Sequence, residues 1–559
     1  MGIKGDLLFM NQRKIGKVVL DYTYFNTSDV YSDGDIEEVL LDAAKNDAMQ
    51  KLLYTNNDWA VLYHCSNIRE NLLHWYPFKQ DGNLLEIGSG CGALTNLFSK
   101  KVKSLTCIEL SERRSLVNAY RNKNCDNIKI MLGNFQDIKL EEKFDYITLI
   151  GVWEYAESYI DSQTPYMDML RMLKNYLKED GTILIAIENK MGIKYWNGAV
   201  EDHTSRQYSG LNDYVDDKRK IRTFSRPEIE QLFAGVGIDS YKFYYLMPDY
   251  KLPDIIYSDD RLPNPGELRQ YRQDYNAPRV YNFYDATIQD QLCSDKMIGY
   301  FSNSFLIECG KNLSNIIFAK YNRNRKEEYT ISTIILNENE KWSVRKSAIF
   351  PSAQSHIDSL IKKDKYNFSK MKTLKGKLDG DCYITDYLEG QDVDVFLYQY
   401  RNHSTLFINR VGEILETYFR PAKEEQYPFE VTEEYLKLFG ENVPENSYSL
   451  KQTNVDMIFS NIRIVEDEGV YCLDNEWVYD FPIPYEYVIW RVLSQLYSKY
   501  MVYLRNKISK REFMVALGLN DKNFEVYQRM EKNFSKNVLG EDYRKHYLQS
   551  ALTYGIRFM

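Results

Sequence analysis

The sequence predicts an α/β protein in two parts: a mostly parallel sheet covered by helices, followed by a smaller α+β unit. Three observations support this prediction. The chain has 559 residues, which is too long for one hydrophobic core, so we expect at least two domains. From residue 82, short apolar runs alternate with polar stretches of helical spacing. From about residue 315, strand-like runs come first and helical stretches follow.

The apolar runs of the first part have the length of buried strands. They are "NLLEIG", "SLTCIEL", "IKIMLGN", "FDYITLIGV" and "GTILIAIEN". Between the last two, "TPYMDMLRMLKNYLKED" has apolar residues at helical spacing, from Tyr166 to Leu177. Later, Ser225 and Glu228 form a capping box that predicts a helix start, and Gly235 or Gly237 can end that helix.

Composition limits the function classes. With 44% hydrophobic and 27% charged residues, the chain has the composition of a globular protein. Its 71 basic and 80 acidic residues give a net charge of −9, which argues against nucleic acid as a partner. The eight cysteines form no CxxC pair, so we expect no zinc site and a reducing compartment.

Features that the sequence lacks indicate its location and its domain arrangement. No apolar run approaches the roughly 18 residues of a membrane span, and no signal peptide is recognisable, so the predicted location is the cytoplasm. No repeat or low-complexity linker separates the halves, so we expect them to pack together. Residues 260–300 read as irregular, and "GKNLSN" offers a turn. The predicted boundary is near 311, giving domains 1–311 and 312–559.

A glycine turn follows the first strand. Gly88, Gly90 and Gly92 let the backbone turn sharply and approach a ligand. With Ala93 the same turn also satisfies a dinucleotide pattern, so other residues must decide. The carboxylate of Glu86 would attract the cationic amino acid end of S-adenosylmethionine and repel a pyrophosphate.

Three further positions extend the predicted cofactor site. Glu109 ends the second strand and suits a bidentate contact with ribose hydroxyls. Asn134 and Phe135 follow the third strand, where an amide and an aromatic face could hold adenine. "IGVWEY", which contains Gly151, follows the fourth.

These four motifs, in this order, make residues 82–245 resemble the class I S-adenosylmethionine-dependent methyltransferases. "LLEIGSGCG" matches their first motif, Glu109 the acidic second, "GNFQD" the adenine loop, and "FDYITLIGVWEY" the strand beneath the methyl donor. The resemblance implies a Rossmann-like fold that binds S-adenosylmethionine. The alternative is a Rossmann-like scaffold that binds no nucleotide.

A long polar and aromatic insertion, residues 188–214, follows the fifth strand, where the acceptor lid of such a fold would lie. Within it, His203 is the candidate general base, with Glu201 or Asp202 orienting it. Lys194 and Arg206 are the candidates for holding an anionic sugar or phosphate. The alternative is that His203 caps a turn and the charges are solvated.

The second half carries oxygen ligands at a spacing that suits phosphoryl transfer. Asp456 and Asn461 fit the pattern DxxxxN, and Asp474 follows the strand-turn-strand "IRIVEDEGVYCLD". Upstream, Lys346 lies in the strand-like "KWSVRKSAI", from which it could reach phosphates. A helix-like stretch, "PSAQSHIDSLIKKDK", follows.

This order resembles the protein kinase and aminoglycoside phosphotransferase fold, with a small lobe at about 315–390 and a large lobe at about 391–559. The resemblance implies ATP bound near Lys346, Asp456 as the catalytic aspartate, and Mg²⁺ held by Asn461 and Asp474. Two features depart from the pattern: no glycine loop joins the first two strands, and the helix after Lys346 has no glutamate to pair with it. A degenerate, noncatalytic module is therefore the alternative.

The whole chain is similar to bacterial fused methyltransferase and kinase proteins of surface polysaccharide synthesis. That resemblance implies a bifunctional enzyme acting on the end of a glycan or lipid-linked saccharide. It also implies that the protein could associate peripherally with the inner face of the membrane. Two alternatives stay open: a methyltransferase with a noncatalytic second half, and a methyltransferase of a small metabolite.

Overall fold

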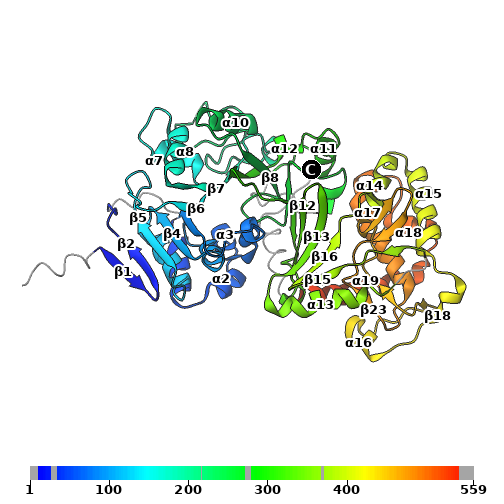
Figure 1. Ribbon diagram of the computed structural model, residues 1–559. Helices are drawn as coiled ribbons and strands as arrows, with labels where there is room; N and C mark the ends of the chain where they lie inside the picture. Colours follow the sequence, from blue (N-terminus) through cyan, green and yellow to red (C-terminus); the bar gives the residue numbers. More distant parts are fainter. Residues whose placement is uncertain are drawn as a thin grey trace, which may run out of the picture.

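The computed structural model describes residues 11–26, 34–215, 217–218, 220–270, 279–366 and 370–540. The end of the predicted large lobe, beyond residue 540, and part of the predicted irregular stretch, residues 271–278, lie outside the described residues. Figure 1 shows the blue and cyan first part at one end, the yellow and orange helices at the other, and green strands between them.

The first part contains the predicted parallel sheet. Five parallel strands lie in the order β5-β4-β3-β6-β7. Beyond β7, β10 runs antiparallel and separates β7 from β8. At the other edge, the hairpin β1-β2 adds β2 parallel to β5. The bounds are β1 Gln12–Ile15, β2 Val18–Asp21, β3 Asn83–Ile87, β4 Ser104–Glu109, β5 Ile128–Leu132, β6 Phe144–Ile150, β7 Leu177–Glu188, β8 Tyr241–Met247 and β10 Ser304–Gly310.

Helices cover both faces of this sheet, which explains the continuous apolar runs. Alternate residues of one strand enter different cores: Leu85 packs with residues of α8 and α10, and Leu84 packs with Phe98 of α5. A separate small core joins the N-terminal helices to α6. The bounds are α1 Ile36–Lys45, α2 Met49–Thr55, α3 Trp59–Cys65, α4 Asn71–His74, α5 Thr95–Lys101, α6 Glu112–Arg121, α8 Pro165–Tyr176 and α10 Arg226–Gly235.

The predicted start of α10 agrees with the structure, and the predicted end of α8 does not. The Ser225 and Glu228 capping box of α10 is confirmed, because the Glu228 carboxylate accepts from the Ser225 amide at 2.7 Å. The end of α8 was predicted too late. Leu177 already belongs to β7 and pairs with Phe144, because β7 starts directly at the end of the helix.

The predicted boundary near 311 falls in a turn, but the sheet does not end there. Strand β9, Ile255–Ser258, pairs with β8 on one side and with β11, Ile316–Tyr321, on the other. Within the described residues, one sheet of 15 strands therefore runs through both halves. Residues 260–300, read as irregular, include the helices α11, Asp285–Ser294, and α12, Ile298–Phe301.

The second half begins with antiparallel strands in the order β11-β12-β13-β16-β15 and continues with helices around a large aromatic core. The strand and helix predicted around Lys346 are present as β13 and α13, and the predicted strand-turn-strand is β21-β22. The bounds are β12 Ile331–Glu338, β13 Lys341–Ala348, α13 Gln354–Lys363, β15 Lys377–Asp379, β16 Cys382–Asp386, α14 Val393–Leu397, α15 Ser404–Ile414, α16 Glu433–Phe439, β21 Ile462–Val465, β22 Gly469–Cys472, α17 Tyr485–Leu504, α18 Lys510–Ala516 and α19 Phe524–Leu539. None of the helices in the described ranges has the length and apolar character that crossing a membrane requires.

Candidate functional site

The turn after β3 carries the three predicted glycines. Gly88 and Gly90 have φ values of +69° and +53°, a region that side chains disfavour. A Cβ on Gly88 would lie 2.4 Å from Val152 Cγ2, so this glycine allows the turn to pack against the segment after β6. A Cβ on Gly90 would meet nothing within 4 Å, and Gly90 lines a cavity. Gly92 packs against Asn118 instead.

Two buried carboxylates flank this turn. Glu86 lines the cavity and accepts a hydrogen bond from Thr95 Oγ1 at 2.7 Å. Burial raises the pKa of Glu86 to about 7, so a nearby cation would favour its charged form. Glu109 accepts hydrogen bonds from the backbone amides of Gly90, at 2.7 Å, and Ser111, at 2.9 Å. Glu109 therefore holds the glycine turn in shape as well as lining the neighbouring space.

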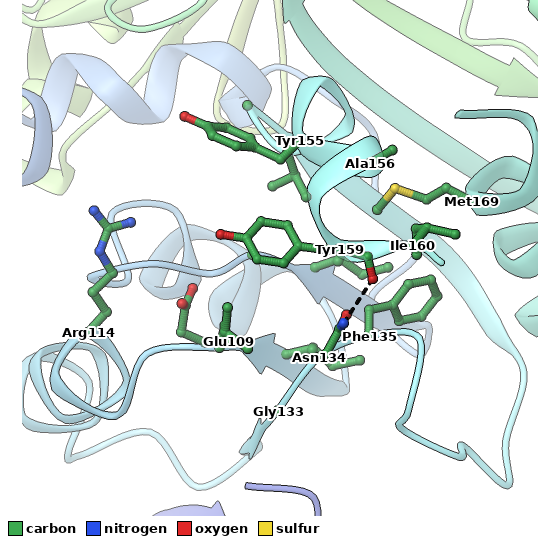
Figure 2. Close-up of a pocket in the computed structure, with 16 residues that line it drawn as sticks. Glu109, Arg114, Gly133, Asn134, Phe135, Tyr155, Ala156, Tyr159, Ile160 and Met169 are labelled. Atoms are coloured by element: carbon green, nitrogen blue, oxygen red, sulfur yellow. Dashed lines mark hydrogen bonds between the residues drawn. The ribbon is translucent and has the colours of Figure 1, made fainter. Parts of the chain in front are cut away.

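A mostly apolar cavity opens beside the turn, with Glu109 and Tyr159 projecting into it (Figure 2). Asn134 and Phe135 line it, at the positions predicted for adenine recognition. Asn134 Nδ2 donates to the Tyr159 carbonyl at 2.8 Å, so it joins the two walls. The segment after β6 and helix α8 supply the opposite wall, of which only Tyr155 belongs to a predicted motif, "IGVWEY". Its residues are Tyr155, Ala156, Tyr159, Ile160 and Met169.

A polar cavity joins the apolar one. Four residues line both: Gly88, Arg114, Gly151 and Tyr155. An elongated ligand with an aromatic end and a charged end would fit across the two cavities. The far end of the polar cavity carries a group of charged side chains, which are Glu154, Glu188, Asp202, His203 and Lys251.

His203 enters this end from the segment between α9, Ile193–Trp196, and α10. Its Nδ1 lies 3.1 Å from Tyr155 Oη, and its Nε2 lies 3.7 Å from Glu188 Oε2. Glu201 Oε2 accepts from the backbone amide of His203 at 2.9 Å. Glu201 therefore shapes the turn, whereas Tyr155 and Glu188 orient the ring. This corrects the prediction that Glu201 or Asp202 orients the imidazole.

The charged side chains at this end shift one another's pKa values. Burial opposes the charge on His203, but the carboxylates of Glu188 and Glu154 outweigh burial and raise the pKa of His203 to about 9. Burial and the nearby Glu188 raise the pKa of Glu154 to about 8. Burial also opposes ionisation of Glu188, but Lys251, 2.5 Å away, and His203 hold its pKa well below the usual range. The raised pKa favours the protonated imidazole beside Glu188, and the role of His203 as a general base stays a prediction.

Lys194 and Arg206, the two cations predicted to hold the acceptor, lie in different surroundings. The side chain of Lys194 is fully buried, and its Nζ donates to Asp202 Oδ2 at 2.7 Å. Tyr195 Oη donates to the same oxygen at 2.7 Å. Lys194 therefore fixes Asp202 and is not presented to an acceptor. Arg206 is exposed and lines neither cavity, so the structure does not bring it to this site.

The raised pKa of His203 has a consequence for stability. Because its pKa in the folded chain, about 9, exceeds the usual histidine value of 6.5, its contribution is complete below pH 6.5 and is lost as pH rises through 9. We expect the free energy of unfolding to fall by on the order of 3 kcal/mol over this window. In the His203→Gln variant, the free energy of unfolding, measured in urea, should change less between pH 6 and pH 10 than in the unchanged chain. The same dependence of the free energy of unfolding on pH in both proteins would contradict the ion pair between His203 and Glu188.

The second half contains a buried ionic cluster around Lys346. Lys346 Nζ lies 2.9 Å from Asp474 Oδ1 and 3.0 Å from Glu476 Oε1. Burial opposes the charge on Lys346, but these two carboxylates outweigh it and raise its pKa. Arg325, from the connection between β11 and β12, lies 2.5 Å from Glu476 Oε2. The partner that the sequence did not find for Lys346 is thus Glu476, and His356 of α13 lies 3.7 Å from it.

The structure also brings Asp456 and Asn461 together. Asn461 Nδ2 donates to Asp456 Oδ2 at 3.0 Å, while Arg491 Nη1 lies 2.6 Å from Asp456 Oδ1. Burial, with Glu476 and Asp456 nearby, raises the pKa of Asp474. Each of these carboxylates is therefore already paired with a cation or an amide of the chain. Arg491 and Arg325 lie far from the DxxxxN pattern in sequence, so spacing could not reveal them.

Comparisons with known proteins agree with this geometry in the first half. Residues 61–240 match the family model described as a methyltransferase domain. An uncharacterised methyltransferase of Staphylococcus carnosus is 25% identical over 134 residues, covering 24% of this chain and 60% of the relative. Ribosomal RNA small subunit methyltransferase A of Malacoplasma penetrans is 30% identical over 84 residues, covering 15% of this chain and 31% of the relative.

Among solved structures, phosphoethanolamine N-methyltransferase 1 of Haemonchus contortus aligns at 14% identity with a TM-score of 0.29, covering 51% of this chain and 52% of that chain. The chain spans less than two thirds of the length of the curated relatives it matches. Residues 61–240 contain a methyltransferase domain, and its sheet has the class I Rossmann-like arrangement described above. The family match ends at residue 240, before the second half begins.

Proposed function

We propose that the chain transfers a methyl group from S-adenosylmethionine to the end of a glycan or lipid-linked saccharide. The observation that carries this proposal is the pair of joined cavities at the carboxyl ends of β3, β4 and β6. One cavity is mostly apolar and the other is polar, and they meet at Gly88 and Gly151. The methyl donor has the same two-ended character, since adenine is aromatic and its amino acid end is charged.

The residues present fit this cofactor. Gly90 leaves open the space that a Cβ would fill. Glu109 keeps lone pairs for ribose hydroxyls, because each of its oxygens accepts one backbone hydrogen bond. Glu86, whose pKa burial raises to about 7, would regain its charge beside the cationic amino acid end. The cofactor supplies an electrophilic methyl group, and the chain holds the acceptor in line with it.

The acceptor would lie at the far end of the polar cavity. Charged side chains there, among them Glu188, His203 and Lys251, suit a polar acceptor better than an apolar one. A lipid-linked saccharide would bring the protein to the inner face of the membrane. A small metabolite remains the competing acceptor, because the cavity end would also accommodate a compact polar molecule.

A methyl donor labelled in its methyl group tests the proposal. Purified full chain, incubated with this donor and fractionated cell-envelope material, is expected to release S-adenosylhomocysteine and to label a saccharide-containing fraction. Label in a small soluble metabolite would favour the competing acceptor. Failure of the chain to bind S-adenosylmethionine would reject the proposal altogether.

The second candidate function is phosphoryl transfer by residues 312–559, which would make the enzyme bifunctional. The placement of Lys346 beside Asp474, and of Asn461 beside Asp456, favours it. These residues would hold the phosphates of ATP and Mg²⁺, although their carboxylates are already paired within the chain. A tethered second site would also raise the effective concentration of a shared acceptor.

Release of ADP in the presence of ATP, Mg²⁺ and the saccharide fraction tests this second function. The Asp456→Ala and Asp474→Ala variants are expected to lose ADP release and to keep binding of S-adenosylmethionine. If ADP release is absent, or is unchanged in both variants, the second half is a noncatalytic module.

A further inference from the structure

Three ligand-type side chains meet at the far end of the polar cavity. Glu154 follows β6, Glu188 ends β7, and His203 enters from the segment between α9 and α10. Since β6 and β7 are neighbouring parallel strands, their carboxyl ends bring the two glutamates together. One ligand atom from each of the three residues lies within 4.8 Å of the others. That spacing suits a single cation with bonds of roughly 2.0–2.4 Å.

The atoms that face one another have no hydrogen-bond partner in the described part of the chain. They are Glu154 Oε2, Glu188 Oε2 and His203 Nε2. The two glutamates are 1% and 0% exposed, so solvent does not satisfy them freely. A buried polar atom left without a partner costs on the order of 1–3 kcal/mol, and a bound water, ion or ligand would remove that cost.

The charge balance at this end also favours a cation. Lys251 pairs with Glu188 Oε1 at 2.5 Å, which leaves Glu188 Oε2 directed at His203. Glu154 has no ion pair among the described residues. Carboxyl groups outnumber basic side chains here: Glu154, Glu188, Glu201, Asp202 and Asp249 lie near Lys194, Lys251 and His203.

We infer that Glu154, Glu188 and His203 bind a divalent metal ion at the acceptor end of the methyltransferase domain. Two carboxylates and one imidazole form a set of oxygen and nitrogen ligands that suits Mn²⁺ and its first-row neighbours. Three protein ligands leave coordination positions open, as in metal sites that contact a substrate. The ion would hold an oxygen of the acceptor beside the methyl donor. This inference rests on the proposed function, because it concerns the acceptor of the same site.

The test is a titration of metal-free full chain with Mn²⁺, in which free Mn²⁺ is followed by electron paramagnetic resonance. All proteins carry Asp474→Asn, so that the ionic cluster of the second half does not contribute a site. We expect one Mn²⁺ per chain in this background. Glu154→Gln and Glu188→Gln are expected to weaken its binding at least tenfold. Glu157→Gln, which removes a carboxylate of the same segment outside the cavities, is expected to leave it unchanged.

Glu154→Gln is the decisive variant, because Gln has nearly the same shape and leaves no lysine without its partner. Binding of S-adenosylhomocysteine, followed by thermal shift, shows whether each variant keeps its fold. The inference is overturned if the background protein binds no Mn²⁺, or if Glu154→Gln and Glu188→Gln bind it as well as Glu157→Gln. A thermal shift without Mn²⁺ binding overturns the metal site alone, whereas no thermal shift in the background protein overturns the proposed function.

Discussion

Replacing Gly90 by valine is expected to abolish useful binding of S-adenosylmethionine, with a loss of roughly 100-fold or more, or about 2.7 kcal/mol. A Cβ at this position would enter open space next to the cavity, where it meets no protein atom within 4 Å. The branched side chain would therefore occupy the space left for the ligand. Isothermal titration of the full chain measures the change directly.

Gly380→Val is the matched control. Gly380 lies between β15 and β16, has a φ of +57°, and also has nothing within 4 Å of its Cβ position. The two variants therefore share the backbone strain of a side chain at positive φ, on the order of 1–3 kcal/mol. Only Gly90→Val changes the cavity. Equal affinities for S-adenosylmethionine in both variants would show that the glycine turn does not bind the methyl donor.

Replacing Lys346 by methionine is expected to destabilise the second half by about 3–5 kcal/mol. The change leaves the buried Glu476 and the partly exposed Asp474 without the ammonium group that now lies 3.0 Å and 2.9 Å from them. Calorimetric unfolding of the full chain would show the loss as a lower transition temperature. Binding of S-adenosylmethionine is expected to persist, because the first half retains its own cores.

Lys341→Met provides the comparison on the same strand. Lys341 also pairs with an aspartate, Asp386 at 3.5 Å, but both side chains are about three-quarters exposed. An exposed pair of this kind contributes little to stability. Similar transition temperatures for Lys341→Met and Lys346→Met would show that the Lys346 cluster is not a structural centre of the second half.

Local patterns predicted much of the first half. Strand, glycine turn and helix follow one another directly in sequence, so the placement of Gly88, Gly90 and Glu86 could be inferred from spacing. The order of the parallel strands then put Glu109 and Asn134 at the same edge. The boundary was harder to predict, because β9 and β11 continue one sheet past residue 311 and their pairing joins segments that are distant in sequence.

The partners of the charged side chains in both candidate sites could not be predicted from local spacing. Lys194 was assigned to an acceptor because of its charge, but its partner Asp202 becomes visible only when the lid is folded. Glu154 and Glu188 could have been suspected, since both follow neighbouring strands at their carboxyl ends. Glu476 could also have been suspected as a partner of Lys346, because it lies only two residues after the predicted site residue Asp474.

A structure of the full chain with S-adenosylhomocysteine tests the central claim most directly. We expect the adenine in the apolar cavity beside Phe135, the ribose at Glu109, and the amino acid end towards Glu86. The thioether sulfur should then face the end of the polar cavity that holds Glu188 and His203. Ligand bound elsewhere, or bound with its amino acid end among the apolar walls, would contradict a methyl transfer site at these cavities.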